Sequence, residues 1–119
     1  MTIVRRDIPA LPDLVFATAA EPVRLADWLP RPLELVGVND DVLILRHGER
    51  LCQVRATVDL DLLRLSWTPL ADDGCAGTLR VSPRGVGRSV VELDHEDEEL
   101  AGRLLDALAE QVEATFIEG

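Results

Sequence analysis

The sequence has no tyrosine, and aromatic residues make up only 3% of its 119 residues. Its core must therefore be built from leucine, valine, isoleucine and alanine, and recognition by aromatic stacking is limited. An excess of positive charge is also missing, since 12 basic side chains stand against 22 acidic ones and give a formal net charge of −10. Nucleic-acid affinity depends on cationic side chains that release counterions, so we expect no nucleic-acid partner.

Long hydrophobic runs are absent as well. No apolar segment approaches the roughly 20 residues of a membrane-spanning helix, and the acidic character opposes binding to anionic lipid. The opening segment 1–7 contains a basic pair without a following apolar stretch, which is not typical of a secretory signal. These features predict a soluble, cytoplasmic protein with no membrane partner.

The sequence contains only two cysteines, Cys52 and Cys75. Neither has a second Cys or His nearby that would complete a tetrahedral zinc site. We expect two free thiols and no disulfide, because Cys52 falls in a predicted strand and Cys75 in a predicted hairpin loop. Nucleophilic triads and phosphate-binding glycine loops are also missing, so the sequence predicts no metal, no cofactor and no catalytic residue.

The strongest periodic signal lies near the C-terminus. Apolar residues recur at helical spacing from Glu98 to Phe116, which predicts one long amphipathic helix with a buried face. Asp97 is the predicted N-cap, and the acidic residues around it suit the positive end of the helix dipole better than a metal site. The stripe consists of Leu100, Leu104, Leu105, Leu108, Val112 and Phe116.

Strands are predicted where apolar and polar residues alternate. The clearest run is Cys52, Val54, Ala56 and Val58, with polar residues between them. Turn residues separate the runs, so hairpins of an antiparallel sheet with one exposed face are the expected connections. The remaining predicted strands are 3–8, 33–38, 42–46, 63–67, 78–82 and 89–95.

Between the first strand and the sheet meander, the segment from Pro12 to Pro30 predicts two short helices. A break at Glu21 and Pro22 divides them, because proline suits the first turn of a helix. The resulting order is one strand, two short helices, about six strands and a long helix, which predicts an α+β fold. The length fits one domain over residues 1–119.

Two segments carry a family resemblance. The run Leu14-Val15-Phe16-Ala17, followed by Glu21-Pro22-Val23-Arg24-Leu25-Ala26-Asp27-Trp28-Leu29-Pro30, resembles the opening of the SRPBCC superfamily of START-like and polyketide cyclase-like proteins. The order of elements is similar too, including Leu65-Ser66-Trp67 in mid-sheet. The resemblance implies a helix-grip fold, in which a curved antiparallel sheet wraps around the C-terminal helix and an apolar cavity opens between them.

Carried onto this chain, the resemblance implies an inward-facing set of ligand-binding residues, although a role in the core alone explains most of them more simply, because buried leucine and valine need no ligand. Trp28 is the favoured pocket residue, because a large amphipathic ring beside a helix end suits a pocket mouth. We expect its truncation to weaken binding and leave the fold largely intact. The full set is Trp28, Leu29, Cys52, Val54, Trp67, Leu79, Leu93, Leu108 and Val112.

Titratable residues give weaker signals. Asp94 and Glu96 could tune His95, yet we expect His95 on the surface at a strand end, and His47 exposed in a turn. Asp27 is expected to face water. Arg46 and Arg55 are expected to form cross-strand pairs with Glu34 or Asp59. The inward faces therefore offer almost no ionisable group.

These expectations favour a binding domain for a small hydrophobic molecule, such as a lipid, a polyketide or another apolar metabolite. The resemblance also implies an alternative, a polyketide cyclase or aromatase that orients proton transfers in the cavity. A third alternative is an interaction module that docks a protein partner or a second copy of the chain to form a homodimer.

Overall fold

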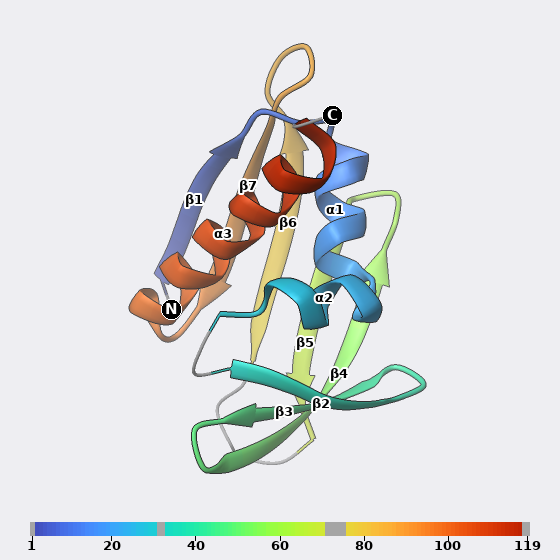
Figure 1. The fold of residues 1–119 in the computed structure, drawn as a ribbon, viewed down its shortest axis with the longest axis vertical. Helices are drawn as coiled ribbons and strands as arrows, with labels where there is room; N and C mark the ends of the chain where they lie inside the picture. Colours follow the sequence, from blue (N-terminus) through green and yellow to red (C-terminus); the bar gives the residue numbers. More distant parts are fainter. Residues whose placement is uncertain (1, 31–32, 71–75, 118–119) are drawn as a thin grey trace.

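The protein is described from a computed structural model that defines residues 2–30, 33–70 and 76–117, without the side chains of residues 116 and 117. Within these residues the chain forms a seven-stranded sheet and three α-helices (Figure 1). The strands are β1 (Thr2–Ile8), β2 (Leu33–Asn39), β3 (Val42–His47), β4 (Arg50–Asp59), β5 (Arg64–Pro69), β6 (Gly77–Pro83) and β7 (Ser89–His95). The helices are α1 (Pro12–Ala20), α2 (Pro22–Trp28) and α3 (Glu98–Val112), and a π-helical turn (Glu113–Ile117) follows α3.

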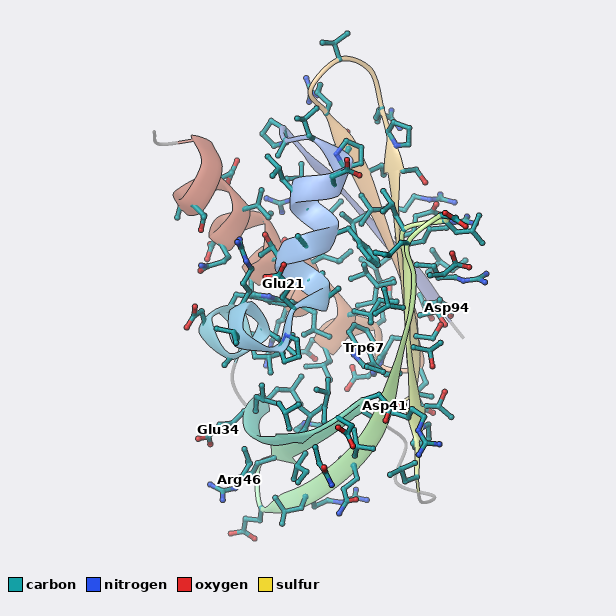
Figure 2. The ribbon with its side chains drawn as sticks, turned by 90° about the vertical axis from the view of Figure 1, so that its right-hand side faces the viewer. Glu21, Glu34, Asp41, Arg46, Trp67 and Asp94 are labelled. Atoms are coloured by element: carbon teal, nitrogen blue, oxygen red, sulfur yellow. The ribbon has the colours of Figure 1, made fainter. Side chains whose placement is uncertain are left out.

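All neighbouring strands pair antiparallel, in the order β1-β7-β6-β5-β4-β3-β2. Strands β2 to β7 form a meander, and β1 joins it as the edge strand beside β7. The helices lie on one face of the sheet, and β2, β3 and the adjoining part of β4 curve beneath them (Figure 2). The predicted α+β architecture with a curved antiparallel sheet is confirmed.

Helix α3 begins as its sequence predicts. The Asp97 side chain accepts a hydrogen bond from the Leu100 backbone N–H at 3.1 Å, so Asp97 is the N-cap. The predicted apolar stripe from Leu100 to Val112 is buried. The α-helix ends at Val112 instead of continuing to Phe116, because the chain changes to π-helical hydrogen bonding at Glu113.

The core lies between the inner face of the sheet and helices α1 and α3. Helix α1 contacts β6 and β7, and α3 contacts β1 and β7. Leu79 and Leu93 from the sheet meet Leu105 and Leu108 from α3 in this core, and each is at most 1% exposed. Burial of such side chains stabilises the fold by about 1.5–3 kcal/mol each.

The outer face of the sheet carries charged side chains, as alternation requires. Arg46 lies 3.6 Å from Glu34, which confirms that predicted pair. The prediction for Arg55 is wrong, because it pairs with Asp41 at 3.3 Å, while Asp59 pairs with Arg64 at 3.9 Å.

Two further predictions concern burial and thiols. Asp27 is exposed on α2, as expected. Cys52 is a buried free cysteine, whereas Cys75 lies outside the described residues. None of the helices in the described part of the chain is long and apolar enough to cross a membrane.

Candidate functional site

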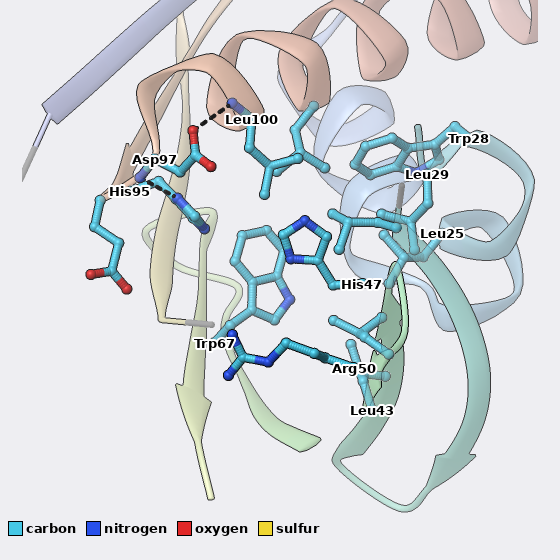
Figure 3. A pocket seen from close by; sticks show the side chains of 14 residues that line it. Leu25, Trp28, Leu29, Leu43, His47, Arg50, Trp67, His95, Asp97 and Leu100 are labelled. Carbon is cyan, nitrogen blue, oxygen red and sulfur yellow. Dashed lines mark hydrogen bonds between the residues drawn. The ribbon is translucent and has the colours of Figure 1, made fainter. Parts of the chain in front are cut away.

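A cavity of about 270 Å³ lies where the curved strands meet α2 and the start of α3 (Figure 3). Its walls are mostly apolar and come from α2, α3, β3, β5 and the segments beside them. Its polar groups come from the β3–β4 hairpin and from the connection between β7 and α3. The apolar lining residues are Leu25, Trp28, Leu29, Leu33, Leu43, Leu45, Trp67, Leu100 and Leu104, and the polar ones are His47, Arg50, His95, Glu96 and Asp97.

Trp28 forms a rigid part of the wall. Its indole N–H donates a hydrogen bond to the Thr18 carbonyl of α1 at 2.9 Å, and only 5% of the residue is exposed. A buried indole needs such an acceptor, because its N–H would otherwise be desolvated without a partner. Trp28 therefore lines the cavity as a buried residue that ties the end of α2 to α1, and not as an exposed residue at the mouth.

Trp67, Gly77 and His95 form a row across three adjacent strands, since Gly77 pairs with Trp67 on β5 and with His95 on β7. A Cβ at position 77 would lie 3.1 Å from His95 Cδ2 and 3.2 Å from Trp67 Cε3. Both distances are shorter than ordinary van der Waals contact. The missing side chain at Gly77 therefore lets the indole and the imidazole both pack against the backbone at position 77.

His95 is held by a backbone hydrogen bond. Its Nδ1 accepts the Asp97 N–H at 2.9 Å, so the neutral ring carries its hydrogen on Nε2. Nε2 has no hydrogen-bond partner among the described residues, and it lies on the side of the ring turned away from Asp97 (Figure 3). The expected surface position of His95 is wrong, because the residue is only 7% exposed.

His47 and Arg50 face each other across the β3–β4 turn. Gly48 adopts a φ of +66°, which glycine tolerates and which closes this two-residue turn. Directly opposed residues project to the same face of a sheet, and both of these line the cavity. The expected exposure of His47 is therefore wrong: the residue is half-buried.

The rim is charged. Arg50, Glu96 and Asp97 are exposed, whereas the leucines and Trp28 deeper in the cavity are buried or half-buried. These three residues therefore mark the solvent side of the cavity. One carboxylate oxygen of Asp97 is already engaged by the Leu100 N–H.

The structure separates the predicted ligand-binding residues into two groups. Trp28, Leu29 and Trp67 line the cavity. The others are at most 2% exposed and do not line this cavity, because four are buried on the inner face of the sheet and two on the buried face of α3. This second group is Cys52, Val54, Leu79, Leu93, Leu108 and Val112.

His47, Arg50 and His95 are absent from the predicted lining. Strand alternation would have placed them on the inward face. His47 is in phase with Leu43 and Leu45, and Arg50 is in phase with Cys52. His95 likewise continues the inward face of β7. The expectation that the inward faces hold almost no ionisable group is therefore wrong at the strand ends. In the described residues, no group of three His, Cys, Asp or Glu side chains is placed to hold a metal ion.

Known proteins resemble this chain in structure. No family model matches the sequence, and no curated protein matches it. The aromatase/cyclase Zhui from Streptomyces sp. R1128 superposes with a TM-score of 0.75 at 14% identity, covering 99% of this chain and 97% of that chain. A START superfamily protein from Mycobacterium smegmatis gives a TM-score of 0.66 at 12% identity, over 98% and 97% of the two chains. The chain has the helix-grip fold of these proteins.

A protein from Thermus thermophilus superposes on this helix-grip chain with a TM-score of 0.70 at 22% identity, over 97% of this chain and 98% of that chain. The predicted resemblance is thus confirmed at the level of the fold. The cavity of this chain combines an apolar wall with the Nε2–H donor of His95, the imidazole of His47 and the cation of Arg50.

Proposed function

We propose that the chain binds a small, largely apolar molecule in the cavity between α2, the start of α3 and strands β3 to β5. The observation that carries this proposal is the convergence of nine apolar side chains on a space of about 270 Å³. An apolar cavity of about 150 Å³ holds a molecule of benzene's size, and pockets for drug-sized ligands begin near 300 Å³. The expected ligand is therefore compact, with one or two rings or a short branched chain.

A titration with the neutral fluorescent probe N-phenylnaphthylamine tests the proposal, because its emission rises in apolar surroundings. Leu45→Phe should fill part of the cavity and weaken binding at least about 10-fold, since the new ring occupies the space of the probe. Leu51→Phe is the matched control. Leu51 lies on the neighbouring strand, is 61% exposed and does not line the cavity, so this variant should bind as the wild type does.

Absence of saturable binding to the wild-type protein, or equal affinity in two folded phenylalanine variants, would contradict the assignment of the cavity. Mass spectrometry of small molecules retained after native purification is an independent test that would identify the natural ligand directly. A retained molecule should be lost from Leu45→Phe and kept by Leu51→Phe.

The position of both histidines favours a second candidate function, that of a polyketide cyclase or aromatase. His47 and His95 line one cavity, where an imidazole can donate or accept a proton. Zhui, which superposes on this chain, is an aromatase/cyclase. The test is conversion of a poly-β-ketone thioester. An enzyme should lose turnover in His47→Asn and His95→Asn while probe affinity stays unchanged, whereas a binding protein should give no conversion at all.

A further inference from the structure

Arg50 differs from most arginines of this protein. The chain has no lysine, so its 12 basic side chains are all arginines. Arg31 lies outside the described residues, and nine of the other eleven form ion pairs with a carboxylate at 3.9 Å or closer. Among the described residues only Arg50 and Arg88 form none. Carboxylates are in excess, so a general shortage of acids does not explain why Arg50 is unpaired.

The direction of Arg50 is the second observation. An unpaired arginine on an outer face is ordinarily solvated, as expected for Arg88 in the turn between β6 and β7. Arg50, however, is in phase with the buried residues Cys52 and Val54 on β4, so it extends the inward face of the sheet to the rim of the cavity. Its guanidinium is thus the one cationic group among the described cavity-lining residues other than the histidines.

Neighbouring groups set the polarity of the cavity. His47 stands directly opposite Arg50, and the Nε2–H of His95 has no protein acceptor among the described residues. The acidic rim residues, Glu96 and Asp97, belong to the segment before α3, and Asp97 lies well apart from Arg50 (Figure 3). An anion would be repelled at the α3 side and attracted at the hairpin side.

From these observations we propose that the ligand is an organic acid. Its carboxylate binds the Arg50 guanidinium beside His47, and its apolar body lies between Trp67 and the leucines of α2 and α3. This inference rests on the proposed binding function and adds the chemical class and the orientation of the ligand. A guanidinium suits this role, because it presents two parallel N–H donors to the two oxygens of a carboxylate.

Three probes with one ring system test the proposal: naphthoate, naphthylmethanol and naphthylmethylamine, titrated calorimetrically at neutral pH and low salt. The wild-type protein should bind naphthoate about 10-fold more tightly than naphthylmethanol, because a charge-assisted hydrogen bond adds to the same apolar contact. Added salt should reduce this preference. Arg50→Gln should abolish it without changing the affinity for naphthylmethanol, and Arg50→Lys should retain part of it.

Arg88→Gln is the matched control, since it removes the other unpaired arginine and should leave all three affinities unchanged. Equal binding of naphthoate and naphthylmethanol would overturn the organic-acid proposal while the binding function stands. Tighter binding of naphthylmethylamine would also overturn it, in favour of recognition by Glu96 and Asp97. If Arg50→Gln lowered the affinities for naphthoate and naphthylmethanol equally, Arg50 would have a packing role instead. Failure of all three probes to bind would overturn the binding function itself.

Discussion

His95 accepts the backbone N–H of Asp97 through Nδ1 at 2.9 Å, and Asp97 in turn accepts the N–H of Leu100 at 3.1 Å. These two bonds join the end of β7 to the first turn of α3. The connection places His95 in the cavity wall and Asp97 at its rim. One cavity residue thus also holds the start of the helix that closes the cavity.

Replacing His95 should separate its role in the cavity wall from its role in holding the start of α3. Asparagine can place its side-chain oxygen near the position of Nδ1 and keep the bond to the Asp97 N–H, whereas leucine cannot. We expect His95→Leu to be less stable than His95→Asn by about 1 kcal/mol, the usual net value of one hydrogen bond. Urea unfolding of the two variants measures the difference. Equal stability would show that the bond contributes nothing measurable.

Trp28 should matter for stability as well as for binding, because it is buried and hydrogen-bonded to Thr18. We expect Trp28→Ala to lower the free energy of unfolding by about 3–5 kcal/mol, through lost burial and a new cavity. This differs from the expectation that folding would survive truncation. Trp28→Phe should lose less stability, since it keeps a ring in the cavity wall. It is therefore the variant to use in binding measurements. A native-like melting temperature for Trp28→Ala would contradict the buried position.

Gly77→Ala should narrow the cavity. The new Cβ would press on His95 and Trp67 at 3.1 and 3.2 Å, so one ring must shift. We expect weaker binding of N-phenylnaphthylamine and a changed indole resonance of Trp67 in NMR spectra. Gly102→Ala is the control, because nothing lies within 4 Å of a Cβ there. In the middle of α3 this change should leave binding unchanged and stabilise the protein by about 0.5–1 kcal/mol. Unaltered binding and spectra in Gly77→Ala would count against the close packing.

Glu92 should make stability depend on pH. A hydrogen bond from the Arg5 guanidinium at 3.0 Å lowers the pKa of Glu92 below its ordinary 4.5, and charge attraction from Arg5 and Arg80 lowers it further against the opposing effect of burial. Because the folded pKa is depressed, the ion pairs stabilise the protein fully above about pH 4.5, and their contribution is lost as the pH falls through the folded pKa.

Glu92→Gln should therefore reduce stability at neutral pH by less than about 1 kcal/mol, the range of partly exposed ion pairs. The difference from wild type should shrink as the pH falls below 4.5. Denaturant titrations at several pH values measure this trend. Glu110→Gln, on the exposed face of α3, is the control and should not reduce stability at neutral pH. A difference that grows in acid would contradict the lowered pKa.

Local sequence patterns were enough to identify the helices and strands and their buried faces. Alternation along β4, β6 and β7 and the helical stripe of α3 identify the buried residues, because a strand or helix repeats its orientation at a fixed period. Asp97 was identifiable as the N-cap from residue type and position alone. Local periodicity was therefore sufficient to predict an antiparallel sheet with a helix against it.

The position of the cavity, in contrast, follows from how these elements pack in three dimensions. Periodicity shows that Val54 and Arg50 share a face, but not that Val54 is fully buried while Arg50 lies exposed at the rim of the cavity. That difference depends on how far each helix reaches along the sheet and on the bend of β2 to β4. The row of Trp67, Gly77 and His95 depends likewise on strand register, which pairs residues that are far apart in the sequence.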